Sequence, residues 1–342
     1  MVISDLNSLT LDTDDRQFID HPCLGGIILF SRNFESYGQL KSLIRDVKSV
    51  RSDLLICVDH EGGRVQRFRK AFTHIPPMQS LGKFYIADPN EAISASKELG
   101  WLLASELLDV GIEHSFAPVV DLDDGKSQVI GDRSFSTDPK ICVDLAEAFI
   151  GGMNSAGMAS CIKHFPGHGS VVADSHLELP VDNRSIESVT SHDLEPFKRL
   201  AGMSHALMSA HIIFPNIDDQ PASFSKFWLQ DILRKQFDYR GLIFSDDLSM
   251  QGAVSVGSYA ERSVKALDAG CDSLIVCNQR AKAREVLDAV SRYQFKRDPV
   301  SLTSLRLPRQ VQTQVQTERC AHRRARAIEF TEYLWRLCRR TS

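Results

Sequence analysis

Several features that would assign the chain to a particular class of protein are missing from its sequence. No apolar run reaches the length of about 18 residues that a transmembrane helix needs. The first residues, Met1 to Asp5, carry neither a basic segment nor an apolar core. We therefore expect no secretory signal, and the predicted location is the cytoplasm.

Charge and cysteine usage exclude further classes. The formal net charge of -4 speaks against a general affinity for nucleic acid or for anionic membranes. Eight cysteines are present, but none forms a C-x-x-C pair, which argues against a zinc ribbon. Cys57, Cys161, Cys271 and Cys277 lie in or beside apolar runs, where cysteine acts as a small hydrophobe. We predict a reducing compartment and no disulfide framework.

Short apolar runs alternate with longer segments of helical period along most of the chain. The predicted strands span residues 25–30, 54–58, 116–120, 159–164, 206–211, 241–246 and 273–277, with a weaker one at 1–3. The predicted helices span residues 40–50, 91–110, 141–153, 185–200, 227–237 and 259–269. Continuous apolar strands indicate burial on both faces, hence a parallel sheet. This α/β pattern predicts a single-domain (β/α)8 barrel. A doubly wound sheet is the alternative, but no G-x-G-x-x-G follows a first strand.

Polar residues recur where the predicted strands end. They are Asp59, Asp121, Lys163 with His164, His211, Ser245 with Asp246, and Asn278. In a barrel these ends lie on one face, where barrel enzymes carry out their chemistry. The recurrence therefore favours a functional cavity over a set of inert loops.

The densest cluster of titratable residues follows the strand at 159–164. Three histidines, one lysine and one aspartate fall within the 14 residues from Lys163 to His176. Asp174 stands two residues before His176, and a carboxylate beside an imidazole fixes its tautomer and raises its basicity. Such a pair suits a general acid/base near neutral pH, although the spacing alone is a common one.

Two other strand ends offer carboxylates. Asp246 and Asp247 are adjacent, so in a regular strand only one of them should face the cavity. That one is a candidate carboxylate nucleophile, and a helix N-cap is the alternative. Asp59 could accept hydrogen bonds from two hydroxyls. Arg67, Arg133 and Lys163 could donate to hydroxyl or carbonyl oxygens, although each arginine taken alone could equally form a surface ion pair.

The C-terminal part differs from the rest. From Lys296 onward there are 11 Lys or Arg residues against 4 Asp or Glu residues. We expect a linker over 298–317 and then an amphipathic helix packed on an acidic barrel, with its arginines solvated. A weak nucleic-acid or membrane contact is the alternative. The predicted domains are a catalytic barrel over 1–295 and a basic linker with a C-terminal helix over 296–342.

Five motifs in order make the chain resemble the family 3 glycoside hydrolases, and more narrowly the bacterial β-N-acetylglucosaminidases of cell-wall recycling. The resemblance covers residue 1 to about residue 290. The motifs are Asp59 to Arg67, Gly131-Asp132-Arg133-Ser134, Lys163 to Gly169, Asp174-Ser175-His176 and Phe244 to Met250.

The resemblance implies a (β/α)8 barrel and a retaining enzyme without a cofactor. The implied substrate is a small molecule, N-acetylglucosamine (GlcNAc) linked to 1,6-anhydro-N-acetylmuramic acid, with or without its peptides. Neither nucleic acid nor membrane is an expected partner, and we expect a monomer. By this resemblance Asp246 matches the nucleophile, His176 the general acid/base and Asp174 its partner. The implied sugar-binding residues are Asp59, Arg67, Arg133, Lys163 and His164.

The chain departs from the family pattern at His60, where glutamine is expected in close relatives, and after about residue 295. Three rival readings stay open. A metal-dependent hydrolase could use His164, His168, His176 and Asp246, but no H-E-x-x-H spacing is present and no metal is expected. A phosphorylase would use phosphate as acceptor. A non-catalytic sugar-binding protein could share the same fold.

Overall fold

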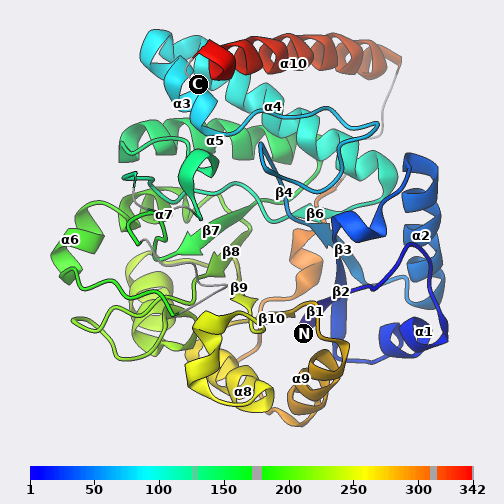
Figure 1. The fold of residues 1–342 in the computed structure, drawn as a ribbon, viewed down its shortest axis with the longest axis vertical. Helices are drawn as coiled ribbons and strands as arrows, with labels where there is room; N and C mark the ends of the chain where they lie inside the picture. Colours follow the sequence, from blue (N-terminus) through cyan, green and yellow to red (C-terminus); the bar gives the residue numbers. More distant parts are fainter. Residues whose placement is uncertain (126, 128, 172–178, 309–313, 341–342) are drawn as a thin grey trace.

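The structure is a computed structural model that describes residues 1–125, 127, 129–171, 179–308 and 314–340. Eight parallel strands form a ring at its centre (Figure 1). Their order around the sheet is β6-β3-β2-β1-β10-β9-β8-β7. The two edges meet through the segment after β6, where the Val120 amide donates to the Lys163 carbonyl over 2.9 Å. The strands are β1 (Val2–Asp5), β2 (Leu24–Leu29), β3 (Leu55–Val58), β6 (His114–Ser115), β7 (Cys161–Phe165), β8 (Ala206–Ser209), β9 (Leu242–Asp247) and β10 (Ser273–Val276).

Helices cover the outside of the ring, which confirms the predicted (β/α)8 architecture (Figure 1). They are α1 (Thr13–Ile19), α2 (Tyr37–Val50), α3 (Gln79–Ala87), α4 (Pro89–Val110), α5 (Pro139–Ala156), α6 (Ile186–Ser191), α7 (Leu194–Leu200), α8 (Tyr259–Ala269), α9 (Arg280–Arg292) and α10 (Gln314–Arg340). A short hairpin of β4 (His60–Gly62) and β5 (Val65–Gln66) extends beyond β3.

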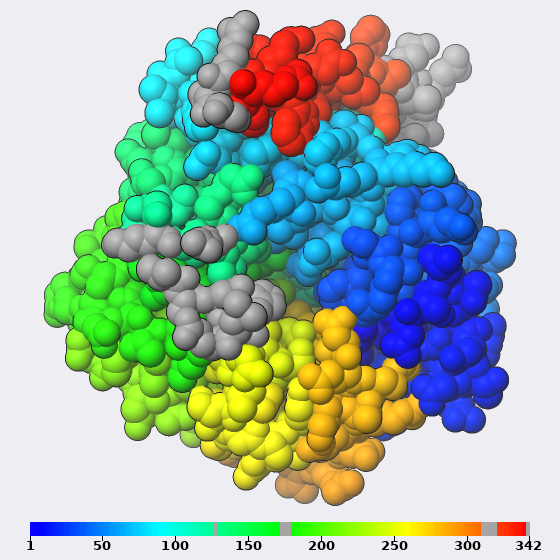
Figure 2. All heavy atoms as spheres, in the orientation of Figure 1, coloured from blue at the N-terminus to red at the C-terminus, as the bar shows by residue number. Residues whose placement is uncertain are grey.

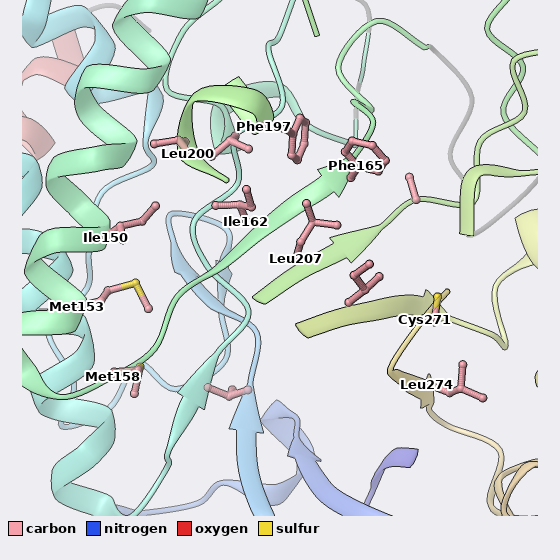
Figure 3. Close-up of a cluster of buried hydrophobic side chains, with 14 of the residues drawn as sticks. Ile150, Met153, Met158, Ile162, Phe165, Phe197, Leu200, Leu207, Cys271 and Leu274 are labelled. Atoms are coloured by element: carbon pink, nitrogen blue, oxygen red, sulfur yellow. The ribbon is translucent and has the colours of Figure 1, made fainter. Parts of the chain in front are cut away.

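The strands are apolar on both faces because each face is buried. Inside the ring, Ile3, Leu55, Phe116 and Phe244 fill the barrel. A second layer lies between the strands and the helices (Figure 3), where side chains of α5 and α7 pack on those of β7 and β8. Burial on both sides explains why the strands read as continuous apolar runs rather than alternating ones.

Three predicted elements differ from those observed. No regular strand is found over 116–120: β6 ends at Ser115, and Val119 forms only an isolated bridge with Lys163. Pro118 has no amide hydrogen to donate to a neighbouring strand. The helix expected over 185–200 is divided into α6 and α7. Pro196 lies in the first turn of α7, where its missing amide is tolerated. The helix expected over 227–237 is a π-helix, Phe227–Gln236, and nothing in its sequence explains that winding.

The segment expected to be a linker closes one end of the barrel. Leu302 and Leu305 form a 3₁₀ turn, and both side chains are buried in the cluster inside the ring. Leu302 approaches Gly25 so closely that a Cβ on that glycine would lie 2.4 Å from its Cδ1. The prediction of a linker over 298–317 is therefore wrong for this turn, because two leucines are too few to produce a visible period.

The C-terminal helix α10 packs against α3 and α4 (Figure 1). Ala327 and Leu334 are buried in this contact. The amphipathic helix is confirmed, but its arginines are not all solvated. Arg323 pairs with Glu98 at 2.5 Å, and Arg324 pairs with Glu106. The domain boundary after residue 295 stays a prediction.

Two findings concern the chain as a whole. All eight cysteines fall within the described residues, and none is joined to another. Over the same residues, no helix has the length and apolar character required to span a bilayer.

Candidate active site

A cavity of about 480 Å³ opens at the carboxyl ends of the barrel strands. Figure 2 shows a hollow near the centre of the molecular face, between the blue, green and yellow parts of the chain. Six of the eight predicted site residues line this cavity: Asp59, Arg67, Arg133, Lys163, His164 and Asp246. The other two, Asp174 and His176, lie outside the described residues.

Asp59 follows β3 directly and is held between two cations. The Lys163 Nζ lies 2.9 Å from its Oδ1, and an Arg67 Nη2 lies 3.4 Å from its Oδ2. Burial opposes ionisation of this carboxyl, but Lys163 and Arg67 outweigh burial and hold its pKa below the ordinary value. Asp59 is therefore an ionised acceptor at neutral pH, suited to hydroxyl groups.

Glu61, which the sequence interpretation missed, is the hub of this wall of the cavity. It accepts two hydrogen bonds from Arg133, each 2.8 Å long, and its Oε1 lies 2.6 Å from the Lys163 Nζ. Burial would raise its pKa, but Arg133 and Lys163 hold that pKa far below the usual range. Glu61 thus fixes Arg133 and Lys163, two of the cations that line the cavity.

A sequence signal for Glu61 did exist. It stands two residues after Asp59 in the same polar motif, and residues at that spacing in a strand share a face. The sequence predicts that the barrel strand ends before Asp59. It does not predict that the chain then continues as the short strand β4.

Asp121 arranges the loop that follows β7. Its Oδ2 lies 2.6 Å from the His164 Nδ1, and its Oδ1 accepts from the His168 amide at 2.8 Å. Asp121 is buried, which opposes ionisation, yet His164 lowers its pKa. Burial lowers the pKa of His168 to about 4, with a smaller effect from His164, so that imidazole is neutral at pH 7. Asp121 therefore sets the orientation of the His164 ring that borders the cavity.

Asp246 and Asp247 end β9, and both border the cavity. The expectation that only one faces it is wrong. Three residue steps on β9, from Phe244 to Asp247, pair with two steps on β10, so β9 carries an extra residue that breaks the alternation. Asp246 accepts from the Asp247 amide over 2.8 Å. Asp247 accepts from the amides of Ser249 and Cys277, and burial raises its pKa to about 6.

The remaining polar strand ends differ in role. Asn278 borders the cavity, whereas His211 and Ser245 do not. The His211 ring is buried, stacks on Phe224 and lies 3.1 Å from the Asp247 carbonyl. Ser245 accepts from the Ile275 amide across the β9–β10 pair. Both residues therefore support β9 from outside the cavity.

The described part of the site combines three cations with ionised carboxylates around a recess. Such a set suits a neutral, polyhydroxylated ligand, because each hydroxyl can both donate and accept. Within the described ranges, no group of three or more histidine, cysteine, aspartate or glutamate side chains has the geometry to hold a metal ion.

Comparisons with known proteins agree with this picture. The model for the glycosyl hydrolase family 3 N-terminal domain matches residues 3–307. The chain is 53% identical over 289 residues to a beta-hexosaminidase of Tolumonas auensis, an alignment that covers 84% of this chain and 85% of that protein. It is 51% identical over 290 residues to a beta-hexosaminidase of Haemophilus influenzae, with coverage of 84% and 82%.

Among solved structures, the fold is similar to NagZ from Neisseria gonorrhoeae in complex with N-trifluoroacetyl-D-glucosamine. The TM-score is 0.88 at 39% identity, and the match covers 97% of each chain. The family match spans most of the sequence, and the solved relative has the same barrel. The chain therefore belongs to glycosyl hydrolase family 3 and is a glycoside hydrolase related to bacterial β-N-acetylglucosaminidases.

Proposed function

We propose that the chain is a retaining exo-β-N-acetylglucosaminidase of cell-wall recycling, acting in the cytoplasm. Its substrate is GlcNAc joined to 1,6-anhydro-N-acetylmuramic acid, with or without a peptide. It removes the terminal GlcNAc through a covalent glycosyl–Asp246 intermediate. It needs no cofactor or metal and acts as a monomer.

The observation that carries the proposal is the position of Asp246 relative to the cation-bound carboxylates. In the eight-strand order, β3 and β9 are four strands apart, so they face each other across the ring. Asp59 and Glu61 follow β3 with their three cations, and Asp246 ends β9. A sugar held by the first wall would present its ring to Asp246 on the second.

The first wall binds the terminal sugar. Asp59 accepts from sugar hydroxyls, whereas Arg67, Arg133 and Lys163 donate to sugar oxygens. His164, oriented by Asp121, supplies a further polar contact. The likeness to the gonococcal NagZ, which binds N-trifluoroacetyl-D-glucosamine, supports a ligand of the 2-acylamino sugar class.

The reaction proceeds in two displacements. An Asp246 carboxylate oxygen attacks the anomeric carbon while the bond from that carbon to the leaving oxygen breaks, and His176 gives its proton to that oxygen. His176, now neutral, takes a proton from water, whose oxygen displaces Asp246 from the anomeric carbon. Two inversions release GlcNAc with its β configuration retained, and both side chains regain their initial states.

Asp174 serves as the carboxylate partner of His176. It stabilises the imidazolium and selects the tautomer that faces the leaving group. A histidine acid also avoids a second negative charge beside the glycosyl–Asp246 ester. The roles of Asp174 and His176 rest on the sequence resemblance.

Side-by-side assays test the proposal. The protein is incubated with the 4-nitrophenyl β-glycosides of GlcNAc and of glucose, with and without phosphate. We expect turnover of the N-acetyl sugar alone, at a rate independent of phosphate. A requirement for phosphate with formation of a sugar 1-phosphate would instead identify a phosphorylase. Sugar binding without turnover would leave only a binding role.

A further inference from the structure

The C-terminal helix α10 lies beyond the part of the chain that the family model matches, yet it contacts a segment that packs on the β4–β5 hairpin of the active site. The family match ends at residue 307, and α10 begins at Gln314. In Figure 2, α10 (red) lies directly against the light-blue surface of the chain around α3. The residues just before α3 connect back to the β4–β5 hairpin, which carries Glu61.

One contact between α10 and this segment is made by Trp335. The Trp335 indole Nε1 donates to the His74 carbonyl over 2.8 Å. The two rings also pack together, with their centroids 4.7 Å apart. Trp335 is half-buried, and an open groove of about 660 Å³ borders the same contact. Solvent would therefore fill the space if the indole were removed.

A second contact anchors the same segment one residue earlier. Both oxygens of Glu106, on α4, accept from Thr73: the amide at 2.8 Å and the hydroxyl at 2.7 Å. Arg324 of α10 pairs with Glu106 and holds this carboxylate in place. The helix therefore supports both Thr73 and His74.

The supported segment is tied in turn to the hairpin. The Gly63 amide donates to the Ile75 carbonyl over 2.8 Å. Gln66 accepts from the Ile75 amide at 3.0 Å and donates to the Thr73 carbonyl at 2.9 Å. Gly62 has φ +115° and leaves no room for a side chain, since a Cβ would lie 2.8 Å from the Pro76 carbonyl oxygen. The hairpin thus cannot shift without the segment it packs on.

We propose that Trp335 is a positioning residue for catalysis: through His74 it holds the β4–β5 hairpin so that Glu61 and Arg67 keep the geometry that binds the terminal sugar. The inference rests on the proposed function, because it assigns these residues to sugar binding. Trp335 does not line the cavity, so it acts through other residues.

The test compares three variants of the full-length protein. W335A removes the indole, and W335F keeps a ring against His74 but loses the donor. Y333A is the matched control, because Tyr333 packs its ring on Phe84 of α3, 4.8 Å away, rather than on residues 73–77. For each variant we would measure KM and kcat on the 4-nitrophenyl N-acetylglucosaminide, the Kd for free GlcNAc, and Tm.

We expect W335A to raise KM and the GlcNAc Kd about five- to twentyfold while kcat stays within about twofold, because binding of ground state and transition state weakens together. W335F should show a smaller rise of about two- to threefold. Y333A should lower Tm comparably but leave KM and Kd near the wild-type values. Hydrogen exchange of the amides in residues 60–75 should quicken in W335A, less so in W335F, and not in Y333A.

Two results would overturn the positioning role. One is a W335A enzyme with unchanged KM and Kd, whatever its Tm. The other is an equal rise in KM for W335A and Y333A, which would indicate general loosening of α10. If W335A fails to fold, the same comparison is made with W335F. Failure of the proposed function is distinguishable, since the wild-type protein itself would then not hydrolyse the substrate.

Discussion

The two facing walls of the cavity shift the pKa of their carboxyl groups in opposite directions. On the β3 side, Glu61 is buried and Asp59 is partly buried, and neighbouring cations hold the pKa values of both below the ordinary range. On the β9 side, the hydrogen bonds that Asp247 accepts from the described residues come from backbone amides and a hydroxyl, and burial raises its pKa to about 6. Burial acts on both walls, so the neighbouring cations decide the protonation state.

The difference indicates that the two walls have different functions. A wall of paired charges is rigid and permanently ionised, which suits the binding of a neutral sugar. The opposite wall carries Asp246, the proposed nucleophile, and beside it Asp247, for which no paired cation is found among the described residues. We infer that binding belongs to the first wall and bond making to the second.

The largest effect is expected from removing Asp246. D246A should lose about 10⁴-fold or more in kcat, because no other group attacks the anomeric carbon. Hydrolysis of the 4-nitrophenyl N-acetylglucosaminide measures it. D247N is the adjacent control and should lose less than about tenfold. If D247N were the inactive variant and D246A the active one, the nucleophile would have to be reassigned to Asp247.

The next effect concerns His176. H176A should lose about 10² to 10⁴ in rate on the natural disaccharide, whose leaving group needs a proton. The loss should be much smaller with 4-nitrophenol, which leaves as an anion. Rates on both substrates give the comparison. Equal losses would argue against an acid role for this histidine.

A third change alters the wall that binds the sugar. E61Q leaves Arg133 and Lys163 without their shared carboxylate, so kcat/KM should fall about 10²-fold as both cations shift. Urea unfolding should show a loss of about 3 kcal/mol, because one partner of a buried ion pair is removed. D144N, which breaks the solvent-exposed pair of Asp144 with Lys140, should change stability far less. Wild-type kcat/KM in E61Q would contradict the role of Glu61 as hub.

The smallest effect concerns pH and has opposite signs on the two walls. Asp247 has a folded pKa of about 6, above its unfolded value of about 3.9. The folded state therefore binds more protons between pH 4 and 6, and stability should fall by about 1–2 kcal/mol as pH rises through that range. D247N should remove this fall, which urea unfolding at several pH values would detect.

Glu61 behaves in the opposite sense. Its folded pKa is lowered, so its stabilisation is present above the unfolded pKa of about 4.3 and is lost as pH falls below it. The loss of stability in acid should be smaller in E61Q than in the wild-type protein. If the free energy of unfolding depended on pH in the same way in E61Q and D247N, the proposed difference between the two walls would be wrong.

Much of the barrel was predictable because its strands are buried on both faces and leave continuous apolar runs. The polar strand ends likewise predicted that Asp59, Lys163, His164 and Asp246 lie around one cavity, since the barrel topology brings such ends together. Local irregularities were not predictable. The extra residue in β9 that turns Asp247 to the cavity depends on pairing with β10, which the sequence of β9 alone does not encode.

Tertiary contacts account for the other misses. Glu61 could be recognised as a hub only once β4 placed it between Arg133 and Lys163, residues far away in the chain. Trp335 lies in the predicted amphipathic helix, but nothing in the sequence singles it out, since its contact with His74 joins positions 261 apart. Single long-range contacts of this kind leave no periodic trace.

The central claim is that Asp246 forms the covalent bond to the sugar. The most direct measurement traps that intermediate with a 5-fluoro N-acetylglucosaminyl fluoride, followed by peptide mapping of the labelled protein by mass spectrometry. We predict a single adduct that fragmentation places on Asp246 and that disappears in D246A. An adduct on Asp247 or on another carboxylate, or turnover with no adduct and an inverted product, would contradict the account.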